Sequence, residues 1–188
     1  VWLHGGGFFA GSSIEQIAYD GENMSREGDV VVVSLNHRLN VLGYLDLSPF
    51  GEEYEASANA GSLDMIAALQ WVHDNIAAFG GDPDNVTIFG QSGGGAKVWT
   101  LMQMPAADGL FHKGIVQSGI YEMLGDVENQ DGTQIVEAIL KELGLGRGDV
   151  KQLETIPYEQ LAAAYKKAAP AIQASGGYVG NEPHISKD

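Results

Sequence analysis

The amino-acid sequence predicts an α/β fold in which helices cover both faces of a mostly parallel sheet. The run DVVVVSLN at residues 29–36 lacks the alternation of a half-buried strand. Such continuous apolar runs are typical of parallel strands that are covered on both faces. Predicted strands also alternate with predicted helices as far as about residue 120, and this order favours a parallel sheet.

The first part of the chain supplies two of the predicted strands and one long helix. Residues 1–4 (VWLH) indicate the end of a buried strand, and residues 29–36 form the next strand. A polar, partly helical connection at residues 14–26 lies between them, and residues 48–61 are predicted to be a loop. From residue 62 to 79, apolar side chains recur with mostly helical spacing.

Two further strands flank the next predicted helix. Residues 86–90 (VTIFG) form a short apolar run that leads directly into glycines and a predicted helix from Gly93 to about Met104. The helix is expected to stop near Pro105, because proline cannot continue it. Residues 113–119 (KGIVQSG) form the fourth predicted strand.

Beyond residue 120 the pattern changes from alternating strands and helices to helices alone. Residues 133–143 and 158–169 are predicted helices, and the final stretch SGGYVGNEPHISKD is a polar tail expected to be loosely ordered. We interpret the chain as one partial domain, with a sheet core at residues 1–120 and a helical segment with a polar tail at residues 121–188.

Composition excludes several classes of function. The chain has 188 residues, of which 44% are hydrophobic, and a formal net charge of −15. Such an acidic surface repels phosphate backbones, so nucleic acid is not an expected partner. Cysteine is absent, which excludes disulfides and thiolate chemistry. No apolar stretch approaches about 18 residues, so no membrane span is expected. The cellular compartment stays open.

Ser92 lies in the stretch GQSGG at residues 90–94, which matches the pattern G-x-S-x-G between a predicted strand and a predicted helix. In this context the chain turns sharply and presents the serine hydroxyl above the sheet. The pattern alone leaves another interpretation open, in which the serine only caps the helix in a glycine-rich turn.

A second glycine-rich turn, HGGGF at residues 4–8, favours the catalytic interpretation of Ser92. Acyl transfer through a serine creates a tetrahedral oxyanion, which needs fixed N–H donors. Consecutive glycines can turn their N–H groups toward one point without a side chain in the way. An H-G-G-G stretch upstream of G-x-S-x-G is the pairing found in lipases and esterases.

The sequence resembles the type-B carboxylesterases of the α/β-hydrolase superfamily, which include para-nitrobenzyl-type esterases and the cholinesterases. The resemblance covers residues 1–119 and is weak thereafter. It rests on the ordered blocks HGGGF, NHRLNVLGYL, NAGSLDMIAALQWVHDNIAAFGGDP, VTIFGQSGGGAKV and GLFHKGIVQSG. It implies an α/β-hydrolase-type sheet that is incomplete at both ends.

The resemblance assigns catalytic roles to four residues. Ser92 is expected to be the nucleophile, and the N–H groups of Gly6, Gly7 and Gly93 are expected to form the oxyanion hole. No metal or cofactor is expected. The substrate would be a small, uncharged ester.

Other positions match family features outside this group of four. Arg38 and Asp64 occupy positions that form a buried structural ion pair, and Ser118 stands where a buried serine supports the catalytic acid. Gln91 replaces the glutamate that many members carry beside the nucleophile, which removes a negative charge.

A catalytic acid and base are not identified by the sequence. In the family both residues lie farther along the chain than the matching blocks reach. His184 is the only histidine after Ser92 that comes late enough to be a base, and acid candidates before it include Asp126, Asp131 and Glu182. No predicted strand flanks His184, which favours the polar-tail interpretation.

The leading hypothesis is therefore a serine carboxylester hydrolase that works through an acyl-enzyme at Ser92. Two alternatives stay open. The chain could be an esterase fragment with little or no turnover because the acid and base are missing, or a non-catalytic binding module on the same fold. The strands at residues 30–35 and 115–117 would also have open edges, which predicts self-association or a partner chain there.

Overall fold

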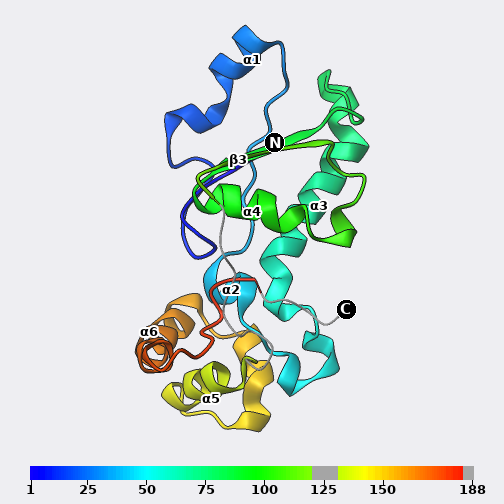
Figure 1. Cartoon of the computed structure of the whole chain (residues 1–188). Coiled ribbons are helices and arrows are strands. Elements are labelled where there is room, and N and C mark those ends of the chain that lie inside the picture. The colour runs from blue at the N-terminus through cyan, green and yellow to red at the C-terminus, as the bar shows by residue number, and fades with distance from the viewer. Residues whose placement is uncertain (120–130, 184–188) are drawn as a thin grey trace. The chain divides into compact units, whose positions relative to one another are not determined.

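The computed structural model describes residues 1–119 and 131–183 (Figure 1). The chain divides into two compact units, each made of two separate stretches. The first unit contains Val1–Arg38 and Gly61–Met123, and the second contains Leu39–Ala60 and Leu124–Asp188. The two units are described separately below.

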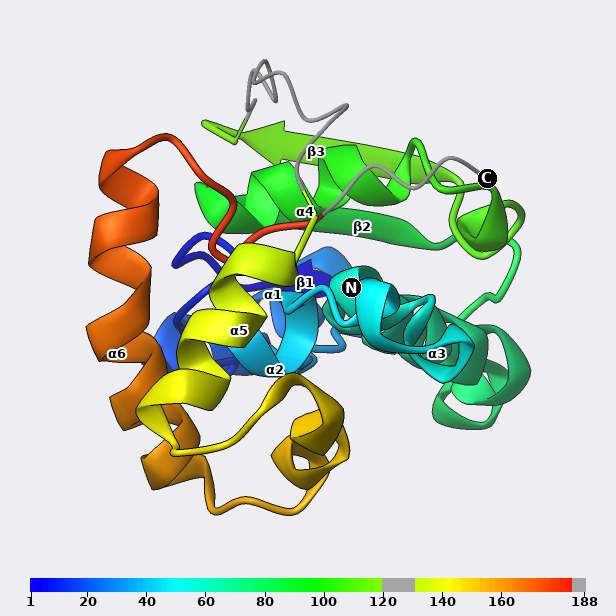
Figure 2. The same ribbon diagram turned by 90° about the horizontal axis from the view of Figure 1, so that it is seen from below.

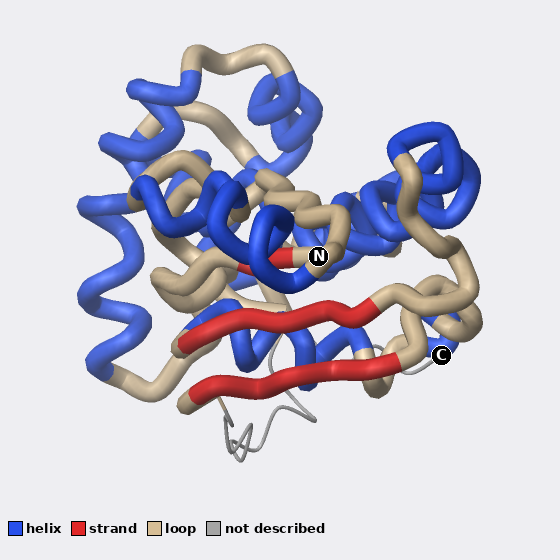
Figure 3. Tube along the Cα trace, turned by 90° about the horizontal axis from the view of Figure 1, so that it is seen from above, coloured by secondary structure: helices blue, strands red, loops and turns tan. Residues whose placement is uncertain are grey.

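The first unit contains a parallel sheet of three strands, in the order β1, β2, β3. Their bounds are Trp2–Leu3, Thr87–Gln91 and Lys113–Gln117. Phe89 of β2 pairs in register with Trp2 on one side and with Ile115 on the other. Strands β2 and β3 run side by side along their whole length (Figure 3). These three strands confirm the parallel sheet expected from the alternation of elements.

The strand predicted at residues 29–36 is wrong as an element. It makes one parallel bridge, between Trp2 and Ser34, and the Trp2 N–H donates to the Val33 carbonyl at 2.7 Å. Val30 and Val31 are 47% and 39% exposed. The segment reaches β1 at a single point, and among the described residues no strand lies on its other side to extend a ladder.

Helices pack on the sheet and form the core of the first unit. α4 (Gly93–Leu101) lies against all three strands, and α3 (Ala60–Asn75) joins the same core before a 3₁₀ turn at Ile76–Phe79. The buried side chains of this core are Leu3, Leu35, Met65, Leu69, Ile88, Val98, Leu101, Ala107 and Leu110.

Aromatic rings cover part of the other face of the sheet. Trp2 packs against Phe89 with ring centroids 5.1 Å apart, and Tyr19 packs against Trp2 at 5.0 Å. Tyr19 belongs to a 3₁₀ turn at Ile17–Asp20, which precedes α1 (Glu22–Gly28). The predicted polar connection at residues 14–26 is thus partly helical, as expected, and it contributes one ring to this face.

The second unit is helical and has its own core. α5 (Thr133–Glu142) and α6 (Tyr158–Ala174) pack side by side (Figure 2). α6 continues through Pro170, beyond the predicted end. The sequence analysis missed α2 and four 3₁₀ helices, whose bounds are Asn40–Tyr44, Ser48–Phe50, Glu52–Tyr54, Ser57–Asn59 and Arg147–Glu154. Within the described ranges, no helix is long and apolar enough to cross a membrane.

The predicted loosely ordered tail is wrong where residues 177–183 are concerned. Val179 is 6% exposed and belongs to the core of the second unit, and the Tyr178 hydroxyl donates a hydrogen bond to the Tyr44 carbonyl. The stretch is mostly polar, but Tyr178 and Val179 pack in or against the core of this unit. The stretch therefore follows a fixed path.

A buried carboxylate also organises the second unit. Asp46 is almost fully buried, and it accepts hydrogen bonds from the backbone N–H groups of Gly132 at 3.0 Å and Ser48 at 2.9 Å. A Cβ added to Gly132 would lie 1.8 Å from the Asp46 carbonyl oxygen, so only glycine fits there. Asp46 thereby connects the start of the 3₁₀ helix at Ser48–Phe50 to the start of α5.

Candidate active site

Ser92 is the single residue between β2 and α4. It has φ 56° and ψ −124°, a conformation that residues with a side chain rarely adopt. Its N–H donates to the Gln117 carbonyl at 2.8 Å, and its own carbonyl accepts from the Ala96 N–H at 3.1 Å. These two bonds hold the turn between β3 and the first turn of α4. Ser92 itself is exposed.

Glycines around Ser92 let three segments of backbone meet. A Cβ added to Gly94 would lie 2.0 Å from the Leu3 carbonyl oxygen, and one added to Gly90 would lie 2.4 Å from the Gly94 carbonyl carbon. A side chain at either position would push α4 away from β1 and β2. The G-x-S-x-G spacing is thus a packing requirement as well as a feature of the turn.

The second glycine-rich turn, residues 4–7, lies directly against Ser92. Gly6 and Gly7 have φ of 88° and 62°, which glycine adopts without strain. A Cβ added to Gly5 would lie 3.8 Å from the Ser92 Cβ, and one added to Gly93 would lie 2.2 Å from the Gly7 nitrogen. The structure therefore brings Ser92, Gly93 and the turn at residues 4–7 together.

His4 fixes the beginning of that turn. Its ring is buried, and its Nδ1 lies 2.8 Å from the Gly5 carbonyl oxygen. A carbonyl only accepts hydrogen bonds, so Nδ1 carries the hydrogen. The ring stacks on His37, with centroids 5.2 Å apart. Burial, followed by the positive charge of Lys97, lowers the pKa of His4, and burial lowers the pKa of His37 to about 4.

Lys97 is a residue of this region that the sequence analysis missed. It lies on α4 with no exposed surface, and its Nζ donates to the His4 carbonyl at 2.8 Å. Burial lowers the pKa of its ammonium group to about 7. A sequence signal was available, since Lys97 is the only charged residue in the run GGGAKVWTL.

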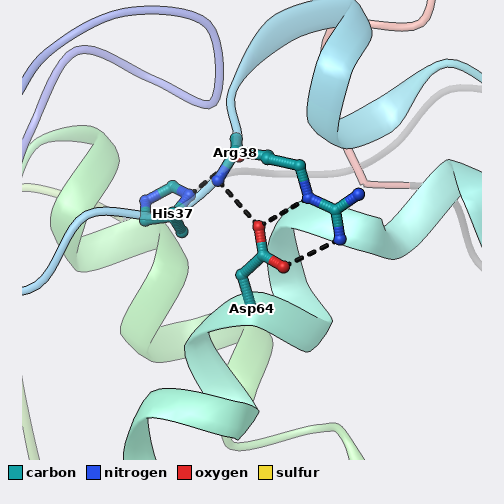
Figure 4. Close-up of polar contacts among 3 residues, drawn as sticks. All are labelled: His37, Arg38 and Asp64. Carbon is teal, nitrogen blue, oxygen red and sulfur yellow. Dashed lines mark hydrogen bonds and ion pairs between the residues drawn. The ribbon is translucent and has the colours of Figure 1, made fainter. Parts of the chain in front are cut away.

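Arg38 and Asp64 form the ion pair that the resemblance implies (Figure 4). The Arg38 Nε and Nη2 each donate to a carboxylate oxygen of Asp64 at 2.8 Å, and the Arg38 backbone N–H donates at 2.9 Å. Their side chains are 55% and 27% exposed, so the expectation of a buried pair is wrong. The guanidinium stem lies at the surface of the first unit, and only the carboxylate is mostly covered.

The remaining expected positions have different outcomes. Ser118 is exposed and has φ 52°, which corrects the expectation of a buried side chain there. His184 and Asp126 lie outside the described residues. Asp131 accepts a hydrogen bond from the Thr133 N–H at the start of α5, and Glu182 is exposed; both belong to the second unit. Across residues 1–119 and 131–183, no cluster of His, Asp and Glu could hold a metal ion.

A parallel sheet with a serine at a strained strand-to-helix turn and a glycine-rich turn beside it defines an α/β-hydrolase fold, which solved esterase structures share. The model of the carboxylesterase family matches residues 1–188. The chain belongs to the carboxylesterase family.

Relatives of known name agree with this membership. The para-nitrobenzyl esterase of Bacillus subtilis (strain 168) is 46% identical over 164 residues, which cover 87% of this chain and 32% of that protein. Carboxylesterase 3 of Homo sapiens is 45% identical over 129 residues, or 69% of this chain and 21% of that protein.

Solved structures give the same result for the fold. An esterase from the anaerobe Clostridium hathewayi, described as able to hydrolyse aliphatic aromatic polyesters, superposes with a TM-score of 0.92 and 61% identity. The match covers 99% of this chain and 37% of that chain. This chain thus spans about a third of the length of these relatives.

Proposed function

We propose that this chain carries the nucleophile and the oxyanion hole of a serine carboxylester hydrolase. The observation that supports this most strongly is the contact between the two glycine-rich turns, with Ser92 exposed at their meeting point. In the proposed reaction, the Ser92 hydroxyl attacks an uncharged ester carbonyl and the alcohol leaves. Water then releases the acid from the acyl-enzyme.

The N–H groups of Gly6, Gly7 and Gly93 are the proposed donors to the oxyanion. Gly93 begins α4, and the N–H groups at a helix N-terminus favour negative charge. Gly6 and Gly7 have backbone conformations that only glycine adopts freely, so their N–H groups can face the same side as that of Gly93. Removing one such donor typically costs about 3–4 kcal/mol of transition-state stabilisation.

Ser92 also requires a base, and that base requires an orienting acid. In the family both lie farther along the chain than the blocks that match here, and we expect them there. A role for His184 with Asp126, Asp131 or Glu182 stays a prediction.

The substrate class follows from charge and from relatives. A net charge of −15 disfavours anionic substrates, so we propose neutral esters. The likeness to the Clostridium hathewayi esterase, which is described as hydrolysing aliphatic aromatic polyesters, supports aliphatic–aromatic esters within that class.

The test is reaction of the 188-residue chain with a fluorophosphonate probe, together with hydrolysis of para-nitrophenyl esters, using Ser92→Ala as the control. Labelling and turnover that both disappear in Ser92→Ala would support the hydrolase. Labelling without turnover would favour the fragment alternative, in which acid and base are missing. Failure of the wild-type protein to react with the probe would favour the non-catalytic binding module.

Association at the sheet edge is a separate proposal. β3 is the last strand of the sheet, and Ile115 on it is 50% exposed. Open apolar edges pair readily with other strands. We expect the isolated chain to self-associate through this edge, and light scattering that gives only the monomer mass at working concentration would contradict it.

A further inference from the structure

Lys97 is a fully buried charged residue of the first unit that the proposed mechanism does not use. Its side chain has no exposed surface, and burying an ammonium group is costly unless it is paired. Among the described residues, its hydrogen bond goes to the backbone carbonyl of His4, at 2.8 Å. No carboxylate is close enough to form an ion pair with it within the described ranges. The buried ammonium group therefore holds one peptide group, the one between His4 and Gly5.

That peptide group lies at the start of the turn at residues 4–7. In a planar trans peptide the C=O and N–H bonds point in opposite directions. The Lys97 contact with the His4 carbonyl therefore aims the N–H of Gly5 away from Lys97. The His4 ring holds the next carbonyl, that of Gly5, at 2.8 Å, and this contact in turn aims the N–H of Gly6. Two successive peptide planes of the turn are thus fixed through their carbonyl groups.

We propose that Lys97 is a positioning residue for the oxyanion hole, because it ties α4, which follows Ser92, to the His4 carbonyl and so fixes the glycine turn against the nucleophile. This inference rests on the proposed function. Lys97 acts through His4 and the backbone, and it does not touch the reacting atoms.

The two histidine rings give the arrangement a second, independent signature. Burial is the main cause that lowers the pKa of His4 and of His37. The positive charge of Lys97 is the second cause, and it lowers both pKa values further. Asp64 acts on His37 in the opposite direction, and Glu15 does so on His4. Removing the Lys97 charge should therefore raise the pKa of both rings, whether or not the protein turns over an ester.

The test compares Lys97→Met with Lys97→Gln in the full natural protein. Both side chains are close to lysine in length and uncharged, but only glutamine can donate a hydrogen bond to the His4 carbonyl. Lys113→Met, at an exposed position on β3, is the control for loss of a positive charge. We expect kcat for a para-nitrophenyl ester to fall ten- to a hundredfold in Lys97→Met, with KM changed less than threefold, because oxyanion donors act in the transition state. Lys97→Gln should recover several-fold of that loss.

Further measurements separate the possible outcomes. NMR titration should show higher pKa values for His4 and His37 in both Lys97 variants. Unchanged kcat in Lys97→Met, or equal kcat in the two variants, would overturn the inference. The proposed function is tested separately by the activity of Ser92→Ala. Loss of cooperative thermal unfolding in both variants would make Lys97 a folding residue and would also overturn it. Esterase activity of Ser92→Ala at the wild-type level would overturn the proposed function, and with it this inference.

Discussion

Replacing Ser92 by glycine should stabilise the protein relative to replacing it by alanine. Both variants lack the hydroxyl, so their difference reports only on the Cβ at φ 56° and ψ −124°. Holding a residue with a side chain in such a conformation costs about 1–3 kcal/mol. Glycine loses about 0.5–1 kcal/mol more conformational entropy on folding. The two magnitudes leave Ser92→Gly more stable than Ser92→Ala by about 1 kcal/mol.

Urea denaturation and thermal unfolding measure this difference directly. For a chain of this length, about 1 kcal/mol corresponds to a shift of about 2–4 °C in Tm. Ala67→Gly, at an exposed position within α3, is the matched control, and there the same change of side chain should destabilise by about 1 kcal/mol. The reasoning fails if Ser92→Gly is no more stable than Ser92→Ala, because the turn would then store no strain.

Three further predictions concern the packing and the titration of buried groups. Gly94→Ala should abolish reaction with a fluorophosphonate probe and lower Tm, because its Cβ would lie 2.0 Å from the Leu3 carbonyl oxygen; probe reactivity at the wild-type level would contradict this. The pKa of His37 is about 4 in the folded state against an ordinary value of 6.5, so the unfolded chain takes up the proton first as the pH falls. The free energy of unfolding should therefore fall as the pH drops from 6.5 toward 4, by about 2 kcal/mol between pH 7 and pH 5. In denaturation experiments at these two pH values, His37→Gln should lack this part of the decrease. Asp46→Ala should destabilise the second unit by about 1–3 kcal/mol, because the buried N–H of Gly132 loses its acceptor; hydrogen exchange at that amide should rise, and unchanged protection would count against the contact.

Sequence patterns predicted the elements whose periodicity and end signals are local. β2, α4 and β3 were all expected near their observed bounds, because an apolar run, a glycine-rich turn and a proline mark them. The strand at residues 29–36 could not be judged this way. Its apolar run satisfies the pattern, yet a strand also needs a neighbour along its whole length, and only Ser34 meets one.

The two glycine-rich turns of the candidate site could be found from the sequence, and the structure brings these turns together. The roles of Ser92, Gly6, Gly7 and Gly93 are implied by the family resemblance and stay predictions. Lys97 could not be assigned a partner from sequence, because that partner is a backbone carbonyl 93 residues away. Burial of Arg38 was misjudged for a related reason, since exposure depends on what surrounds a side chain in three dimensions.

The packed stretch at residues 177–183 limits how far the chain can be shortened from its C-terminal side. A chain cut after α6, at Ala174, would remove Tyr178 and Val179 and would uncover the apolar surface that Val179 fills. Such a shortened chain would expose apolar surface to solvent and would be prone to aggregate during purification. A shortened chain should therefore keep residues 175–183.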